Sequence, residues 1–185
     1  MRKVIGAINT TLDGICDHTA GVPDEELHQH YTNLLISTDA ILYGRITYQL
    51  MEYWRTLLEN PSNTKSMNDF AIAIDKIPKV VFSQTLENVD WNTATLAKRS
   101  LKDEVIALKR QPGKDILVGS RSLIIQLMKM RLIDELQLCV HPVIAGSGSL
   151  LFDNINDRTV FKLTNHKVFD SGAVTLWYEP ITEDM

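Results

Sequence analysis

Short apolar runs alternate with segments of helical character along most of this chain. The runs are nearly continuous, which is typical of strands that are buried on both faces of a parallel sheet. They span residues 4–8, 40–43, 79–82, 116–118 and 136–140. The C-terminal part differs, because residues 160–168 and 173–178 flank Asp170-Ser171-Gly172, a sequence typical of a hairpin turn.

The segments between the runs carry helix signals. Pro23 and Asp24 suit the first turn of a helix, and Ser100 with Asp103 forms a pattern like a capping box. Helices are predicted from about residue 24 to 35, over 47–58, after residue 100 and over 122–131, with loops at 9–21 and 60–68. A chain of 185 residues supports one well-buried core. We therefore predict a single domain over residues 1–185, an α/β fold with three αβα layers, a mostly parallel central sheet and a C-terminal antiparallel hairpin.

Three of the predicted strands end in small or hydroxyl residues. These ends are residues 44–47 (GRIT), 83–85 (SQT) and 119–122 (GSRS). If the strands are parallel neighbours, all three ends lie on one edge of the sheet, where ligands of such folds bind. Backbone amides, hydroxyls and two guanidinium groups would then converge, which suits the phosphates of a nucleotide cofactor. A single glycine between strand and helix is often only a turn, so the prediction rests on the three ends together.

Composition argues against several other classes of function. The net charge is −4 and the pI is near 5.7, so a nucleic-acid partner is not expected. No apolar run approaches the roughly 20 residues of a membrane-spanning helix, and no signal peptide is recognised, so a cytoplasmic location without a membrane partner is expected. Cys16 and Cys139 form no zinc pattern, and His28 and His30 are too close in sequence to share a helix face, so no metal site is predicted.

The order of the motifs resembles the dihydrofolate reductase-like superfamily. The similarity is strongest to the C-terminal reductase domain of bacterial riboflavin-biosynthesis deaminase-reductases. It covers nearly the whole chain through TLDG, DAILYGRITY, KVVFS, ILVGS and RLIDELQLCVHPVIAGSGSLLF. The deaminase signature H-x-E with P-C-x-x-C is absent from the sequence, so a stand-alone reductase-like domain is expected.

The resemblance implies NADPH as the cofactor and a homodimer as the assembly. Position by position, it places Gly44, Arg45 and Thr47 near a phosphate, Ser83 and Gln84 near the adenosine 2′-phosphate, and the run Gly119, Ser120, Arg121, Ser122 and Leu123 along the pyrophosphate. It also brings Ala7 close to the nicotinamide.

The substrate side departs from the best-known relatives. Where dihydrofolate reductases carry a carboxylate on the first helix, ungapped spacing places His28, and no Lys or Arg lies between Lys3 and Arg45. Asn9, Asp13 and His28 are the candidate substrate contacts. Asp13 is also the candidate catalytic acid or proton-relay residue, although Asp-Gly is an ordinary turn sequence.

Two hypotheses from different classes follow. The leading one is an NADPH-dependent reductase that transfers a hydride to a small heterocyclic or carbonyl-type substrate of riboflavin-pathway or pterin-like chemistry. The alternative is a non-catalytic nucleotide- or ligand-binding member of the same fold, since a fold alone does not confer an activity. A structural dimer with a vestigial site is a third and weaker possibility.

Overall fold

The computed structural model describes residues 1–153, 155 and 158–181. Its centre is a sheet of eight strands in the order β4-β3-β2-β5-β1-β6-β8-β7. Neighbouring strands from β4 to β6 are parallel, whereas β8 pairs antiparallel with both β6 and β7. The strands are β1 (Val4–Thr11), β2 (Thr38–Gly44), β3 (Lys79–Phe82), β4 (Ala94–Leu96), β5 (Asp115–Val118), β6 (Glu135–His141), β7 (Phe161–Val168) and β8 (Val174–Pro180). The predicted parallel sheet with a C-terminal hairpin is confirmed.

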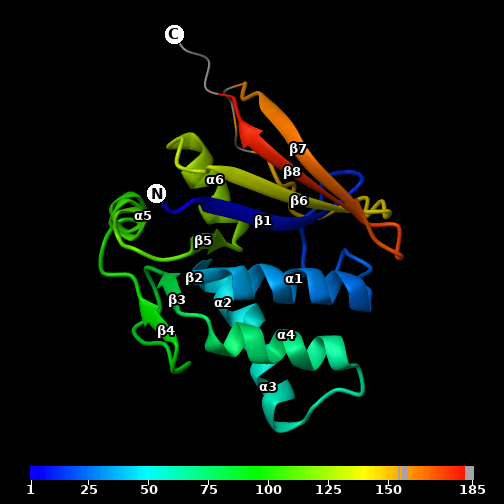
Figure 1. Ribbon diagram of the computed structural model, residues 1–185, viewed down its shortest axis with the longest axis horizontal. Helices are drawn as coiled ribbons and strands as arrows, with labels where there is room; N and C mark the ends of the chain where they lie inside the picture. The colour runs from blue at the N-terminus through cyan, green and yellow to red at the C-terminus, as the bar shows by residue number, and fades with distance from the viewer. Residues whose placement is uncertain (154, 156–157, 182–185) are drawn as a thin grey trace.

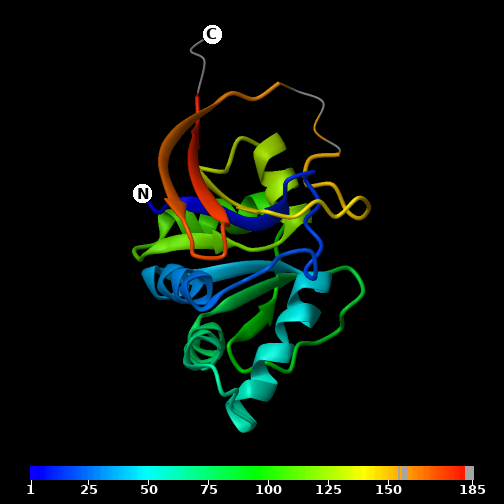
Figure 2. The same ribbon diagram turned by 90° about the vertical axis from the view of Figure 1, so that its right-hand side faces the viewer.

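Helices cover both faces of this sheet and complete the three predicted layers. Helices α1 and α4 lie side by side on one face, and α5 and α6 lie on the other (Figures 1 and 2). The helices are α1 (Glu25–Ser37), α2 (Arg45–Met51), α3 (Tyr53–Glu59), α4 (Lys65–Lys76), α5 (Leu101–Arg110) and α6 (Arg121–Lys129). None of the helices among the described residues is long and apolar enough to cross a membrane.

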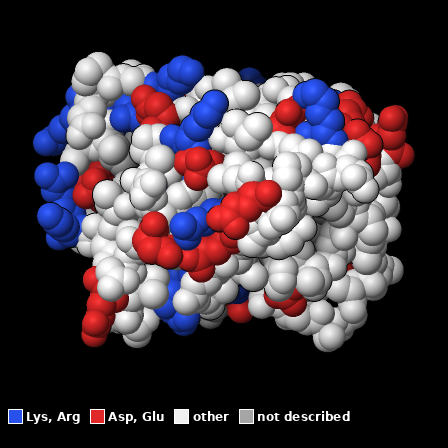
Figure 3. All heavy atoms as spheres, turned by 90° about the horizontal axis from the view of Figure 1, so that it is seen from below, with Lys and Arg blue, Asp and Glu red and all other residues white. Residues whose placement is uncertain are grey.

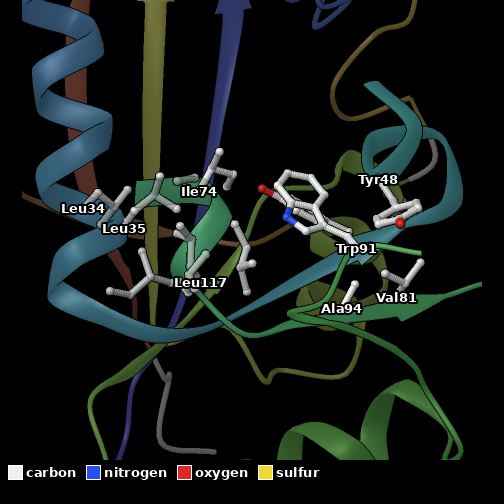
Figure 4. Packing of buried hydrophobic residues seen from close by; sticks show 13 residues of the cluster. Leu34, Leu35, Tyr48, Ile74, Val81, Trp91, Ala94 and Leu117 are labelled. Atoms are coloured by element: carbon white, nitrogen blue, oxygen red, sulfur yellow. The ribbon is translucent and has the colours of Figure 1, made fainter. Parts of the chain in front are cut away.

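Each face of the sheet has its own apolar core. On the first face, Leu34 and Leu35 of α1 pack with Ile74 of α4 and Leu117 of β5, beside a second group that contains Tyr48 and Trp91 (Figure 4). On the opposite face, completely or almost completely buried residues of β1, β2 and β5 meet apolar side chains of α5 and α6. Burial on both faces explains why the central strands have continuous apolar sequences.

Four local predictions were wrong or incomplete. The helix predicted over residues 47–58 is two helices, because the Arg55 amide donates to the Glu52 carbonyl, only three residues back, and tightens the turn there. Residues 65–68, predicted as loop, open α4. The polar start of α4 is held by Asn68, whose side chain bonds both the amide and the carbonyl of Ser62.

The other two differences concern strands. The short edge strand β4 was not predicted, because three residues are too few to show a period. β1 continues three residues into the predicted loop, because β6 pairs with it as far as Thr11↔His141. This extension is important for the site, since it carries Asn9 as part of a strand.

Charged side chains are mixed on the face seen in Figure 3. Basic and acidic groups of the described residues are interspersed there, and an acidic ridge crosses the middle of the view. This face therefore offers no continuous basic surface of the kind that binds a nucleic-acid backbone.

Candidate cofactor-binding site

The ends of β3, β2 and β5 meet at one edge of the sheet, as predicted. The register pairs Gly44 with Phe82 and Leu42 with Val118, so the following residues leave the sheet side by side. A hydrogen bond of 2.8 Å from the Gly44 amide to the Ser120 hydroxyl joins the ends of β2 and β5. Ser120 is almost completely buried and is not among the residues that line the hollow, so its hydroxyl serves to join the two strand ends.

A hollow of about 550 Å³ opens at this edge. Seven of the predicted cofactor residues line it, and they come from three separate parts of the chain. They are Gly44, Arg45, Thr47, Ser83, Gln84, Ser122 and Leu123. The volume is within the range of pockets that bind small ligands and cofactors.

Two features of the hollow favour a phosphate ligand. The first turn of α6 contributes Ser122 and Leu123, whose backbone amides have no partner within the helix. No side chain caps α6, so these amides and the positive end of the helix dipole remain available to an anion. Arg45 is exposed at the rim and bonds Gln49 at 3.2 Å, and among the described residues no acid forms an ion pair with it.

The hydroxyl of Ser83 is held in a defined orientation. Its oxygen accepts from the amides of Thr85 at 3.1 Å and Leu86 at 2.9 Å. Because both amides use the oxygen as an acceptor, the hydroxyl proton can donate either to the Thr85 hydroxyl, 3.5 Å away, or to a ligand. A donor at this position is suited to a phosphate oxygen, as is the exposed amide of the neighbouring Gln84.

One wall of the hollow comes from a segment that was not predicted from the sequence. Residues 97 and 99–101, from the segment after β4 to the first residue of α5, line it together with Gln126 of α6. This segment brings a second guanidinium, Arg99, which is more than half exposed and lies 3.6 Å from Glu104. The only sequence signal for this wall was the capping residue Ser100, whose hydroxyl accepts from the Asp103 amide at 3.2 Å. Without knowledge of β4, the segment could not be placed beside the ends of β2 and β3.

Gly119 and Arg121, the other predicted cofactor residues of the β5–α6 turn, have structural contacts within the protein. At Gly119, an added Cβ would lie 3.0 Å from the ring of Tyr43, so a larger residue would push against a buried side chain. Arg121 donates to the Leu150 carbonyl at 2.7 Å and forms an ion pair with Asp153. In this arrangement the Arg121 side chain ties the turn to the segment after β6.

The second half of β1 extends beyond the end of β5, so one side of its backbone is not paired with β5. Pairing of β1 with β5 ends at Gly6↔Val118, whereas pairing with β6 continues to Thr11. Within the described sheet, the backbone of β1 from Ala7 onward therefore has no strand neighbour on the β5 side. Ala7 itself is buried and is not among the residues that line the hollow.

Asn9 is the exposed residue in the otherwise largely buried second half of β1, and it belongs to a hydrogen-bond network. Its Oδ1 accepts from the Tyr31 hydroxyl at 2.8 Å and lies 3.1 Å from His141 Nε2. The other ring nitrogen of His141, Nδ1, accepts from the Val22 amide at 3.1 Å. The network thus joins β1, α1, β6 and the loop that precedes α1.

The His141 ring is almost completely buried, and an added Cβ at Gly21 would lie 3.0 Å from it. Burial lowers the pKa of His141 below its usual value near 6.5. The neutral ring is therefore the form that the folded protein accommodates.

This burial predicts a loss of stability in acid. The pKa of His141 is lower in the folded protein, so the unfolded chain binds more protons as the pH falls through about 6.5, and the free energy of unfolding decreases. His28 and His30 act in the same direction, because burial lowers their pKa values too. We expect His141→Ala to unfold at a lower temperature at neutral pH but with a shallower decline between pH 7 and pH 5, as measured by thermal denaturation across pH. An unchanged slope would contradict the role of His141.

The carboxylate of Asp13, the candidate catalytic acid, is occupied by hydrogen bonds that stabilise a turn. Its carboxylate accepts from the Thr11 hydroxyl, from the Gly146 amide at 2.7 Å and from the Ala145 amide at 3.1 Å. These donors, the Thr11 hydroxyl foremost, lower the pKa of Asp13 to about 2. Near neutral pH the group is ionised, and it holds the segment after β6 against the turn after β1.

Removal of the Asp13 carboxylate is expected to loosen the segment around Gly146. In Asp13→Ala the amides of Ala145 and Gly146 lose their acceptor, so their hydrogen exchange is expected to become at least about tenfold faster. Exchange measured by NMR tests this expectation, with Asp170→Ala, an exposed turn residue between β7 and β8, as the control. Unchanged exchange at Gly146 would contradict the tether.

His28, the remaining candidate substrate contact, lies on α1 one turn before Tyr31. Its ring meets the edge of Trp54 of α3, with ring centroids 5.9 Å apart, and it is half-buried. His28 and Tyr31 share a face of α1 because they are three residues apart. Along this side of the sheet, Trp54, His28, Tyr31 and Asn9 therefore form a row. Among the described residues, no group of three or more His, Cys, Asp or Glu is placed to hold a metal ion.

Comparison with known proteins identifies the family. The model of the RibD C-terminal domain matches residues 2–175. The chain belongs to this family. It is also 34% identical over 181 residues to the uncharacterized protein YyaP of Bacillus subtilis (strain 168), covering 96% of this chain and 94% of that protein. The RibD-type resemblance expected from the sequence is thereby confirmed.

Solved structures of RibD-like proteins share the fold at low sequence identity. A putative riboflavin biosynthesis protein from Shewanella sp. PV-4 superposes with a TM-score of 0.72 at 20% identity, covering 97% of this chain and 99% of that one. The riboflavin biosynthesis reductase Rib7 of Saccharomyces cerevisiae gives a TM-score of 0.60 at 15% identity, covering 97% and 90%. The RibD C-terminal fold is thus retained over nearly the whole chain.

Proposed function

We propose that this protein is an NADPH-dependent reductase that transfers a hydride to a small heterocyclic or carbonyl-type substrate. The observation that carries the proposal is the hollow at the ends of β2, β3 and β5, where two guanidinium groups and an uncapped helix start converge. Membership of the RibD C-terminal domain family supports a reductase of the riboflavin-pathway type.

Each wall of the hollow has a role in the proposed complex. Arg45, Arg99 and the Ser83 hydroxyl would hold the phosphate on the adenosine ribose, because guanidinium groups bind phosphate through charge-assisted hydrogen bonds. The first turn of α6 would hold the pyrophosphate. The open edge of β1 at Ala7 would receive the nicotinamide, which supplies the hydride when the cofactor is bound.

The row of side chains from Trp54 to Asn9 would form the substrate side of the site. These residues would orient the substrate above Ala7, and the apolar rings would exclude water. We propose that Asp13 supports this region through the segment at Gly146 and does not donate a proton, because its pKa is about 2. A water molecule or a substrate group would then carry the proton.

Calorimetric titration with NADPH and NADH tests the proposal, followed by assays of NADPH oxidation with a panel of carbonyl and heterocyclic acceptors. The proposal expects NADPH to bind at least about tenfold more tightly than NADH, a difference of about 1.4 kcal/mol. It also expects at least one acceptor to be reduced. Tight NADPH binding without turnover would favour the alternative, a non-catalytic ligand-binding protein, and the absence of binding would contradict both.

We also propose that the protein forms a homodimer. The strand β7 is at the edge of the sheet and exposes Leu163 and Val168. Edge strands with exposed apolar residues tend to pair with another chain unless they are covered. Sedimentation velocity measures the assembly directly, and a monomer at all concentrations would contradict the proposal.

A further inference from the structure

We propose that Asn9 determines substrate specificity by donating a hydrogen bond from its amide nitrogen to an uncharged acceptor atom of the substrate. His141 and Tyr31 are the positioning residues that hold the amide in this orientation. The inference rests on the proposed function, because it places the substrate beside the nicotinamide end of the cofactor site.

The orientation of the His141 ring follows from its partners. The backbone amide of Val22 can only donate, and it lies 3.1 Å from Nδ1, so Nδ1 carries no proton. A neutral imidazole then carries its proton on Nε2. The burial of the ring favours this neutral form.

The protonated Nε2 in turn orients the amide of Asn9. It lies 3.1 Å from one atom of the Asn9 amide, and the Tyr31 hydroxyl lies 2.8 Å from the same atom. The Tyr31 hydroxyl can donate or accept, but a protonated Nε2 can only donate, so this atom of Asn9 has to be the oxygen. The nitrogen Nδ2 is therefore the other arm of the amide. In the part of the chain that the structure describes, Nδ2 has no hydrogen-bond partner, and Asn9 is exposed.

The position of Asn9 on β1 places this free donor at the substrate side. Ala7 and Asn9 are two residues apart on a strand, so their side chains point to the same face. Both lie beyond Gly6, where pairing with β5 ends and the edge of β1 is open. No Lys or Arg occurs between residues 4 and 44, so a neutral acceptor such as a carbonyl oxygen or a ring nitrogen fits this donor better than a phosphate does.

A matched pair of probes isolates the donor. Isoquinoline and naphthalene have the same shape, but only isoquinoline carries a ring nitrogen that accepts a hydrogen bond. With the protein near pH 7.5, measured both with and without added NADP⁺, we expect isoquinoline to bind about fivefold more tightly than naphthalene, a difference of about 1 kcal/mol. NMR titration should show the Asn9 side-chain amide signals shift with isoquinoline only. Equal binding of the two probes, or no saturable binding of either at millimolar concentration, would overturn the inference.

Two variants separate recognition from structure. Asn9→Asp keeps an oxygen for Tyr31 and His141 but has no donor, so it is expected to lose the preference for isoquinoline. Asn33→Asp introduces the same change at an exposed position of α1 and should keep the preference. If Asn9→Asp retained the fivefold preference, the inference would be wrong.

The positioning residues have a spectroscopic test of their own. The ¹⁵N shifts of the His141 ring should report a proton on Nε2 at neutral pH. In a separate binding measurement, Tyr31→Phe should reduce the preference for isoquinoline while the NADPH affinity stays within about twofold of the wild type. A proton on Nδ1 would overturn the assigned orientation. Failure of NADPH binding in the wild type, with the isoquinoline preference intact, would contradict the proposed function and leave Asn9 as a ligand donor. NADPH binding without the preference would contradict only this inference.

Discussion

The double variant Arg45→Ala, Arg99→Ala is expected to bind NADPH about 100-fold more weakly than the wild type. Hydrogen bonds to charged groups contribute about 1.5–3 kcal/mol each, and a total loss of about 3 kcal/mol is about 100-fold in affinity. Both guanidinium groups line the same hollow and are exposed there, Arg45 beside Gln49 and Arg99 3.6 Å from the Glu104 carboxylate. Calorimetric titration with NADPH measures the effect.

The comparison with NADH shows which phosphate the two arginines hold. NADH lacks the phosphate on the adenosine ribose, so Arg99→Ala alone should weaken NADPH and leave NADH within about threefold of the wild type. Arg110→Ala, at the exposed C-terminal end of α5, is the charge-matched control and should change neither affinity. An NADPH affinity of the double variant within about threefold of the wild type would contradict the assignment of this hollow.

Lys79 is expected to be the polar residue whose loss destabilises the protein most. Its side chain is 1% exposed at the start of β3. The ammonium group donates to the carbonyls of Asp75 and Ile77 at 3.2 and 2.9 Å and to the Thr93 hydroxyl at 2.7 Å. It also lies 4.0 Å from the centroid of the Trp91 ring. Lys79 thus joins the end of α4, the start of β3 and the segment before β4.

Lys79→Ala removes the donor to the buried Ile77 carbonyl and opens a cavity, whereas the Asp75 carbonyl keeps its hydrogen bond of 2.7 Å from the Thr93 hydroxyl. We expect a loss of about 3 kcal/mol in the free energy of unfolding, because unsatisfied buried groups and core cavities each cost about 1–3 kcal/mol. For a chain of this size the loss corresponds to a decrease of about 6–12 °C in Tm. Thermal and urea denaturation measure it.

Lysine variants nearby provide the controls. Lys76→Ala, at the exposed last position of α4, should change stability by less than about 0.5 kcal/mol. Lys79→Met restores most of the volume but no donor, so it should lie between Lys79→Ala and the wild type. A Lys79→Ala variant as stable as Lys76→Ala would show that the buried ammonium group contributes nothing to the fold.

The sheet could be predicted because its strands have strong local signals. Strands buried on both faces have continuous apolar runs, and the turn at Gly172 and the cap at Ser100 have specific residue types. The start of α4 could not be predicted, since its polar first turn depends on the contact of Asn68 with Ser62. β4 was missed because an edge strand of three residues has no periodicity.

The site was predictable where it follows from strand order and was missed where it depends on side-chain partners. Parallel neighbours bring Gly44, Ser83 and Ser122 to one edge, so their convergence followed from the fold class. Arg99 was missed because its segment reaches the hollow only through β4. The role of Asp13 was missed because its carboxylate accepts a hydrogen bond from the amide of Gly146. The two residues are 133 positions apart in sequence, and no local sequence pattern indicates such a contact.

If four separate segments of the chain form one NADPH site, NADPH should protect all four from amide hydrogen exchange at once. With saturating NADPH we expect slower exchange in residues 44–47, 83–85, 97–101 and 119–126 together, with a smaller effect on β1 after Gly6 and none in β7. Protection elsewhere on the molecule, or no protection of these segments by NADPH, would show that the four segments do not form the cofactor site.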